Sequence, residues 1–307
     1  MTIPLTIRPD RRPFIGLGMA LAGALIITPD TLLIRLSGLE GWGLNFWRGL
    51  LIGFSLLVLW LASEGRHAWR QLTMLHKPPA LIIIFCNFGN SLAFNFATME
   101  TSITVVVTAL ASAPLLAAGL SFLFLREPTP LRTWIAIAST MLGVLIVIFN
   151  GQGALLAPTG NVWLGGGLGV LAALGIASVF VVSRRHHDAP VLLACGIGTL
   201  LSGVFGYIGA PVGGISGGNM LPILLMGLFV MPVSWGLLAL APRHTSPTNV
   251  SLFMLLEMVL GPFWVWIGTG ERPNLPMIGG AALVLLTLML YFIAAAREAQ
   301  KRARTAA

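Results

Sequence analysis

Long apolar runs alternate with short polar segments along almost the whole chain. Each run has about the 20 residues that an α-helix needs to cross the roughly 30 Å hydrocarbon core of a bilayer. Charged residues and Gly/Pro clusters mark the edges of the runs. We therefore predict an all-α integral membrane protein with ten transmembrane helices. These segments are 14–35, 43–62, 79–98, 103–125, 131–149, 163–183, 189–209, 219–240, 248–269 and 275–296.

The connections between these segments alternate in charge. Of the 18 Lys and Arg residues, all except Arg35, Arg48 and Arg272 lie on the side of the two tails and the even-numbered connections. Because cytoplasmic loops are enriched in Lys and Arg, this asymmetry predicts that both termini are cytoplasmic in a multi-pass protein of the inner (plasma) membrane.

Composition agrees with a membrane protein. Hydrophobic residues make up 56% of the 307 residues and charged residues 9%, and the mean hydropathy is +0.90. Such a chain has too few charges to cover a water-soluble globule. A net charge of +8 would indicate nucleic-acid binding in a soluble protein. Here the basic residues lie in the short segments between the apolar runs, so we expect no nucleic-acid partner.

The expected partners are the lipid bilayer and a small-molecule substrate, with protons as a second candidate solute. The expected state is monomer or homodimer.

An internal repeat divides the chain into two halves. Residues 101–127 (TSITVVVTALASAPLLAAGLSFLFLRE) and 245–271 (TSPTNVSLFMLLEMVLGPFWVWIGTGE) both open with Thr-Ser-x-Thr and close on Glu. They cover the fourth and ninth predicted segments. Because five is odd, the second copy enters the membrane from the opposite side, which predicts an inverted repeat with a pseudo-twofold axis in the membrane plane.

The repeat gives a predicted division of the chain. Its parts are a cytoplasmic N-terminal tail (1–13), a first five-helix unit (14–149), an external linker (150–162), a second five-helix unit (163–296) and a basic C-terminal tail (297–307).

With these two halves and the 14-residue spacing of Glu257 and Glu271, the chain resembles the drug/metabolite transporter superfamily, in particular its EamA-type exporters. It departs from the family pattern at Met258, where a proline is expected, and carries Pro262 instead. In the first half, Pro114 occupies the column of Met258. The resemblance implies a secondary transporter, usually an exporter of amino acids or related metabolites.

These observations together predict an inner-membrane secondary transporter that exports a small polar metabolite, such as an amino acid or amino-acid-like compound, by alternating access. A passive facilitator or channel for small solutes, or an importer, remains an open alternative. We do not expect an enzyme or a cofactor, because the segments carry no nucleophile and base, carboxylate pair or metal-binding spacing.

The charged residues inside the predicted segments are the first candidates for substrate binding, because an ionised side chain at the bilayer centre costs about 2.5 to over 10 kcal/mol. Glu257 lies near the middle of the ninth segment. It is a candidate to bind a substrate ammonium or to carry a proton, or else a permanently protonated structural acid. Asp30 follows Pro29 in the first segment, and Arg48 lies in the second. These two form either a structural ion pair or a clamp for a substrate carboxylate.

A polar stripe runs along the third segment at helical spacing. It contains Asn87, Asn90, Ser91 and Asn95. Such a stripe either lines an aqueous pathway or joins helices through hydrogen bonds worth about 1 kcal/mol each. We interpret it as a wall of the substrate pathway. The eighth segment has Trp235 with nearby Met residues instead, and these two walls would suit an amphipathic solute.

Prolines inside the segments are candidate helix breaks and gates. Pro removes a backbone hydrogen bond and frees carbonyl groups that can line a cavity. We predict such breaks at Pro29, Pro114, Pro232 and Pro262.

Glu127 and Glu271 end the two copies of the repeat. For these residues we expect a structural role, in which each carboxylate accepts hydrogen bonds from the free amides at the start of the next helix, and gating is the alternative role.

Overall fold

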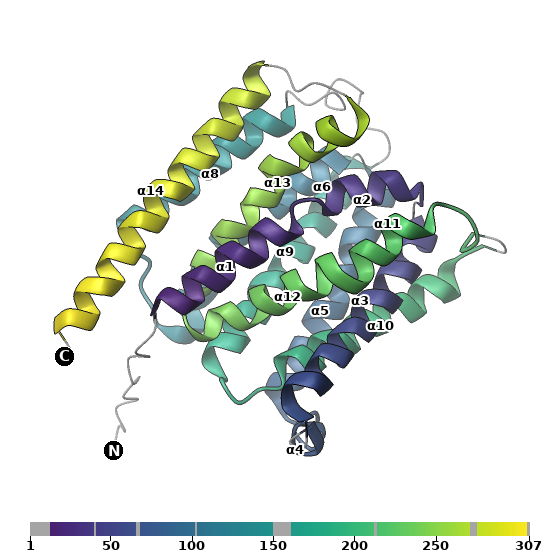
Figure 1. Cartoon of the computed structure of the whole chain (residues 1–307), viewed down its shortest axis with the longest axis horizontal. Helices are drawn as coiled ribbons and strands as arrows, with labels where there is room; N and C mark the ends of the chain where they lie inside the picture. The colour runs from purple at the N-terminus through teal and green to yellow at the C-terminus, as the bar shows by residue number, and fades with distance from the viewer. Residues whose placement is uncertain are drawn as a thin grey trace.

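Helices make up all the regular structure that a computed structural model of the chain describes. It describes residues 13–39, 41–65, 68–101, 103–149, 161–211, 214–270 and 275–305, and these contain no strand (Figure 1). In the N-terminal half the helices are α1 (Pro13–Ile27), α2 (Asp30–Ser37), α3 (Gly41–Glu64), α4 (Ala68–Leu72), α5 (Pro78–Glu100), α6 (Ile103–Leu110), α7 (Ala113–Leu120), the π-helix η2 (Ser121–Leu125) and α8 (Leu131–Phe149). In the C-terminal half they are α9 (Val162–Arg185), α10 (Val191–Gly209), α11 (Met220–Leu225), the π-helix η3 (Met226–Val230), α12 (Met231–Leu240), the 3₁₀-helix η4 (Ala241–Arg243), α13 (Pro247–Thr269) and α14 (Leu275–Thr305).

Eight helical segments of the described residues are long and apolar enough to cross a bilayer. They are Ile15–Ser37, Gly41–Glu64, Pro78–Glu100, Trp163–Arg185, Val191–Gly209, Met220–Arg243, Pro247–Gly268 and Leu275–Ala294. Two further apolar stretches, Ala113–Leu125 and Leu131–Ile146, are shorter and fall where we predicted the fourth and fifth segments. The chain is therefore an all-helical, multi-pass membrane protein.

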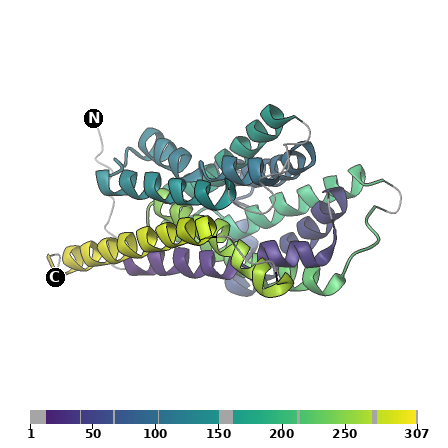
Figure 2. The same ribbon diagram turned by 90° about the horizontal axis from the view of Figure 1, so that it is seen from above.

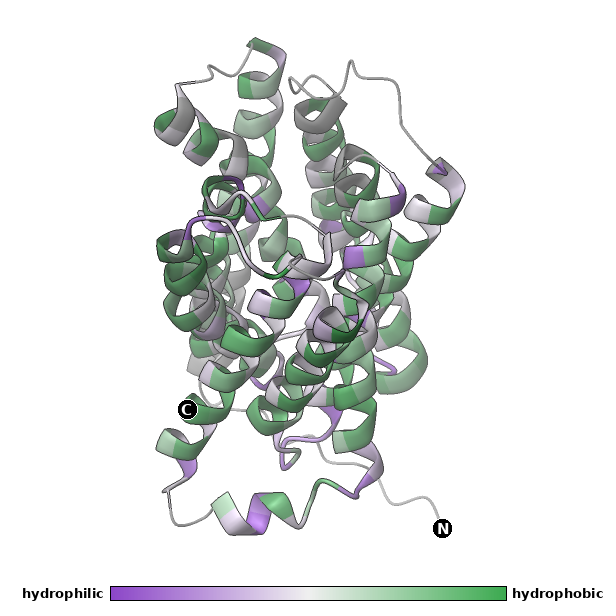
Figure 3. Ribbon diagram, turned by 90° about the vertical axis from the view of Figure 1, so that its right-hand side faces the viewer, coloured by the Kyte–Doolittle hydropathy of each residue, from purple (hydrophilic) through white to green (hydrophobic). Residues whose placement is uncertain are grey.

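Apolar side chains cover the outside of the helices. Phe122, Leu123 and Ile208 are each about two-thirds or more exposed, and Figure 3 shows hydrophobic residues along most of each helix. A surface of this kind suits lipid as its solvent, since soluble proteins rarely expose large apolar patches. In Figure 2, α1 and α14 run side by side, and α1 begins at the end of the molecule where α14 ends.

Helices of the N-terminal half pack mainly against helices of the C-terminal half. The most extensive pairs are α3 with α10, α5 with α9, α8 with α14 and α5 with α10, followed by α1 with α12. Small residues allow this close approach. A Cβ atom added to Gly143 of α8 would lie 2.8 Å from the Gly280 carbonyl oxygen of α14, and one added to Gly280 would lie 2.7 Å from that of Gly143. The two halves therefore form one interleaved bundle.

Three of the four predicted proline breaks coincide with helix boundaries. Pro29 separates α1 from α2, Pro114 is the second residue of α7, and Pro232 is the second residue of α12, directly after the π-helix η3. The fourth prediction, a break at Pro262, is wrong, because α13 is one uninterrupted helix from Pro247 to Thr269. Membrane helices tolerate an internal proline where neighbouring groups satisfy the freed carbonyl.

Candidate functional site

A cavity of about 150 Å³ lies in the middle of the bundle, between the two halves. Its walls come from α1, α2, α3, α5 and α6 of the N-terminal half and from α9, α10, α12 and α13 of the C-terminal half. All eight residues that we proposed for substrate binding line this one cavity. They are Asp30, Arg48, Asn87, Asn90, Ser91, Asn95, Trp235 and Glu257.

An ion pair joins two of these residues. Because Pro29 ends the preceding turn, Asp30 begins α2 inside the bundle, where only 3% of it is exposed. The Arg48 Nη1 atom donates to Asp30 Oδ2 at 2.9 Å. The guanidinium also contacts two sulfur atoms, Met226 Sδ at 3.4 Å and Met231 Sδ at 3.9 Å. Arg48 is therefore held on both sides.

Glu257 is a charged group of the cavity without an ion pair among the described residues. It lies on α13, is half-buried, and interacts electrostatically with both Asp30 and Arg48. Its carboxylate forms no hydrogen bond or ion pair within the part of the chain that the structure describes. An acid in this position is available to a ligand or a proton.

The polar stripe of α5 separates into two groups. Asn87 is 2% exposed, and its Nδ2 donates to the Cys195 carbonyl at 3.0 Å and to Thr199 Oγ1 at 2.8 Å. It therefore joins α5 to α10. Asn90 and Ser91 are half-buried, and neither side chain has a partner among the described residues.

Asn95 occupies the other end of the same stripe. Its side chain is 8% exposed, and the Nδ2 atom has no hydrogen-bond partner in the described structure. Asp30 Oδ1 is likewise buried and unpartnered. The cavity wall thus contains one free buried donor and one free buried acceptor.

Sequence reasoning missed three polar residues of the wall. Asn45 Nδ2 donates to the Ser202 carbonyl at 2.9 Å, and Ser202 Oγ donates back to Asn45 Oδ1 at 2.9 Å. Thr199 is the partner of Asn87. The spacing of Asn45 and Arg48, three residues apart on one helix face, could have indicated the first of them.

Another part of the wall is built from aromatic and sulfur-containing side chains. Trp235 is 7% exposed and packs on Phe180 with ring centroids 6.2 Å apart. Met231 lines the cavity and, with the fully buried Met226, contacts Arg48. Among the described residues no group of three His, Cys, Asp or Glu side chains is placed to hold a metal ion.

A second polar group lies at the end of the bundle where α1 begins, and we call it the polar end cluster. It consists of Glu127, Arg184, Arg185 and Arg243. Glu127 Oε1 accepts from Arg184 Nη2 at 3.2 Å and Nε at 3.3 Å. Arg184 Nη1 donates to the Arg243 carbonyl at 3.1 Å, and Arg243 Nη2 donates to the Ala189 carbonyl at 2.6 Å.

The end cluster also corrects the role that we expected of Glu127. Its partner is Arg184 at the end of α9, not the free amides of the following helix α8. Arg185 Nη1 donates to the Phe124 carbonyl at 3.1 Å. The segment after η2 is thus bound to the other half of the protein. Glu271, the corresponding residue of the second copy, lies outside the described residues.

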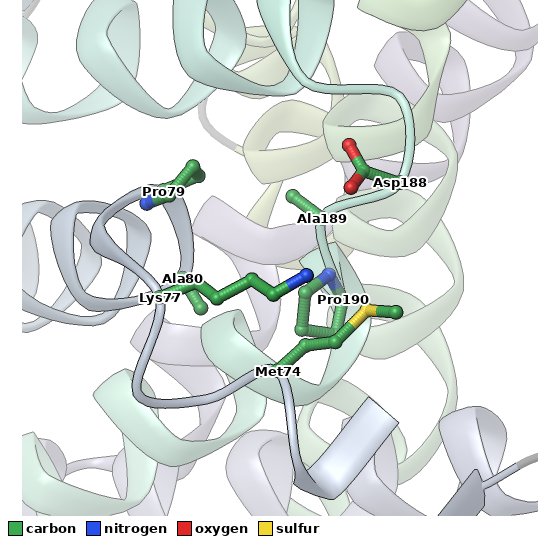
Figure 4. Close-up of a pocket in the computed structure, with 7 residues that line it drawn as sticks. All are labelled: Met74, Lys77, Pro79, Ala80, Asp188, Ala189 and Pro190. Carbon is green, nitrogen blue, oxygen red and sulfur yellow. The ribbon is translucent and has the colours of Figure 1, made fainter. Parts of the chain in front are cut away.

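A small pocket lies between the segment before α5 and the loop before α10. Figure 4 shows the Lys77 side chain extending toward Pro190, with Asp188 on the same loop as Pro190. Its volume of about 20 Å³ holds about one water molecule. This pocket is too small for a metabolite, which leaves the central cavity as the candidate substrate site.

Comparisons with known proteins agree with a transporter. The model of the EamA-like transporter family matches residues 14–149 and again residues 163–293. A relative from Bacillus subtilis (strain 168), described as "Uncharacterized transporter YxxF", is 25% identical over 269 residues, which cover 84% of this chain and 83% of the relative. One crystal structure superposes with a TM-score of 0.75 at 15% identity, over 92% of this chain and 97% of the other, and this likeness concerns the fold alone.

Proposed function

This chain belongs to the EamA-like transporter family, and from that premise we propose that it is an inner-membrane secondary transporter that exports a small polar metabolite by alternating access. An amino acid or amino-acid-like compound is the proposed substrate. The observation that carries the proposal is the central cavity between the halves, whose wall combines the Asp30–Arg48 ion pair with the unpaired Glu257.

The proposed topology is ten transmembrane helices in two inverted halves, 14–149 and 163–296, with both termini cytoplasmic. The two matches to the family model support this division. The helix pairs support it as well. In the proposed numbering, α5 on α9 is the third span on the sixth, and α1 on α12 is the first on the eighth. A pseudo-twofold axis in the membrane plane exchanges these two pairs.

The size of the cavity supports a small substrate. Sites for drug-sized ligands have volumes of roughly 300–1,000 Å³, whereas this cavity has about 150 Å³. Charged groups in the middle of a membrane protein mark substrate or ion pathways, because their burial needs a function or a partner. Glu257 has no such partner among the described side chains.

Alternating access requires that one end of the pathway close while the other opens. In the proposed mechanism the polar end cluster closes the cytoplasmic end, since Arg184 and Arg185 hold the segment of Phe124 and Glu127 against the C-terminal half. The breaks at Pro29, Pro114 and Pro232 supply the places where the helices bend. Opening toward the cytoplasm would separate Arg184 from Glu127.

The experiment is an efflux assay in proteoliposomes loaded with a pool of amino acids and related metabolites. Wild type is compared with Glu257→Gln, which keeps the size of the side chain and removes its charge, with and without an imposed pH gradient. We expect selective efflux by wild type and loss of roughly 10- to 100-fold in the variant, the effect of removing one charged hydrogen bond. Glu100→Gln, an exposed position at the end of α5, is the matched control.

Three results would change the proposal. Absence of efflux of every solute in the pool would reject this substrate class. Efflux that saturates only weakly and is unchanged in Glu257→Gln would indicate a passive facilitator. Uptake of a solute into the proteoliposomes against its concentration gradient would indicate an importer. An effect of the pH gradient that disappears in Glu257→Gln would identify protons as the coupled solute.

A further inference from the structure

We propose that the central cavity selects its substrate by an ammonium group, which binds at Glu257, and by a neutral hydrogen-bonding group, which binds at the polar stripe of α5. A substrate carboxylate is then not required. The substrate class becomes small amines that carry an amide, hydroxyl or carboxyl group nearby. This inference rests on the proposed function and specifies the chemistry of the same site.

Arg48 is the residue that would bind a carboxylate, and it is already occupied. Asp30 Oδ2 accepts from it at 2.9 Å, and the sulfur atoms of Met226 and Met231 lie on its two terminal nitrogens. A substrate carboxylate would have to displace Asp30, which is 3% exposed and would be left as a buried unpaired charge. Such a charge is strongly unfavourable. Arg48 therefore neutralises Asp30 and does not serve as the anion site.

Glu257 offers a negative charge to a substrate ammonium, and binding there would not require an existing ion pair to break. It is half-buried, lines the cavity, and has no ion pair with any described residue. An ammonium group carries three donors and no acceptor. Asp30 Oδ1, buried and without a partner, is a second acceptor in the same wall, which a small movement of the neighbouring side chains would make available.

The stripe of α5 supplies neutral groups for the other end of the substrate. Asn90 and Ser91 face the cavity without partners in the described structure, and the buried Asn95 Nδ2 is a donor in need of an acceptor. A buried amide donor recognises a carbonyl or hydroxyl oxygen as well as it recognises a carboxylate. An analogue without a matching oxygen would leave these polar groups unpaired, and a binding site rejects such an analogue.

The remaining wall is apolar, with Ile52, Phe94, Leu110, Ile176 and Met254. Leucine and its derivatives are therefore suitable probes, because their aliphatic side chain fits this surface. Leucinamide and leucinol keep the amine and replace the carboxylate by neutral groups. N-acetylleucine keeps the carboxylate and lacks the ammonium.

The test measures the thermal unfolding midpoint of the full-length protein in lipid nanodiscs with each of the four compounds. We expect leucine, leucinamide and leucinol to raise the midpoint, and N-acetylleucine to leave it unchanged. Glu257→Gln should weaken the binding of the three amines roughly 10- to 100-fold. Asn90→Ala should weaken it less, and Glu100→Gln not at all.

The inference would be overturned if N-acetylleucine raised the unfolding midpoint. It would also be overturned if leucinamide and leucinol did not raise it. Should Glu257→Gln prove poorly folded, competition on wild type decides, since leucinamide should then inhibit leucine efflux and N-acetylleucine should not. A transporter that moves leucine and ignores leucinamide would refute the inference and leave the proposed function standing. Failure of the pooled efflux assay would refute the function itself.

Discussion

The central cavity and the polar end cluster use the same kinds of side chain in opposite ways. Each contains a glutamate and an arginine from distant parts of the chain. In the end cluster, Glu127 accepts two hydrogen bonds from Arg184. In the cavity, Glu257 has no such bond to a described residue, although Arg48 is close enough to interact with it electrostatically.

The difference identifies which of the two groups is built for stability and which for a ligand. A polar group that is buried without a partner costs about 1–3 kcal/mol, and more when it is charged. Around one cavity, Asn95 Nδ2, Asp30 Oδ1 and the Glu257 carboxylate all lack hydrogen-bond partners within the described part of the chain. In the end cluster most of this desolvation cost is offset by bonds to carbonyls and to the Glu127 carboxylate, and Arg243 Nε is the one buried side-chain atom there without a partner in the described structure. Unpaired groups that gather in one place are better explained by binding than by folding.

The strongest test of this comparison is to break the one pair that the cavity does contain. Arg48→Met would leave Asp30 as a buried unpaired charge, and breaking a buried ion pair from one side costs about 3–5 kcal/mol. We expect a loss of unfolding free energy of that size, measured by SDS-induced unfolding of the purified protein. No other single substitution considered for either region should destabilise as much.

The double variant Asp30→Asn with Arg48→Met is the matched control. Because it removes both charges, it should recover most of the lost stability. If Arg48→Met alone is as stable as wild type, then Arg48 does not neutralise Asp30, and a role as an anion site becomes the better explanation for it.

Sequence alone indicated the residues of the cavity but not their partners. Charged and amide side chains stand out within apolar segments, and helical spacing placed Asn87 and Asn90 on one stripe. Spacing does not show that Asn87 forms a hydrogen bond with Thr199, which lies 112 positions away in the chain, whereas Asn90 forms none with a described side chain. That distinction depends on how α5 packs against α10.

The errors in the sequence predictions have the same origin. We expected Glu127 to bind the following helix, because only neighbours in sequence were known, and the structure places Arg184 beside it. A helix break at Pro262 followed from local chemistry, yet α13 continues through that position. Tertiary contacts decide both outcomes, and local sequence does not encode them.

Asn87 and Asn90 of the stripe provide a test with an expected effect of intermediate size. Asn87→Ala removes two interhelical hydrogen bonds, which in membranes are worth about 0.6–1 kcal/mol each, and should lower the unfolding free energy by about 1–2 kcal/mol. Asn90→Ala removes no bond among the described residues. It should leave stability nearly unchanged and reduce efflux. The comparison fails if Asn90→Ala destabilises the protein as much as Asn87→Ala does.

The smallest expected effect concerns the end cluster. Glu127 and Arg184 are partly exposed, with 29% and 21% of their side chains accessible, and pairs of this kind contribute about 0–1 kcal/mol. Glu127→Gln should therefore change the balance between the closed and open cytoplasmic end by at most about fivefold. We would measure it as the labelling rate of Ser91→Cys by a charged maleimide in inside-out vesicles, in a protein whose Cys86 and Cys195 are replaced by alanine. The rate should rise in Glu127→Gln and stay constant in Glu100→Gln, whose carboxylate is exposed and lies outside both regions. An unchanged rate in Glu127→Gln would mean that the paired glutamate fixes the fold without closing the pathway.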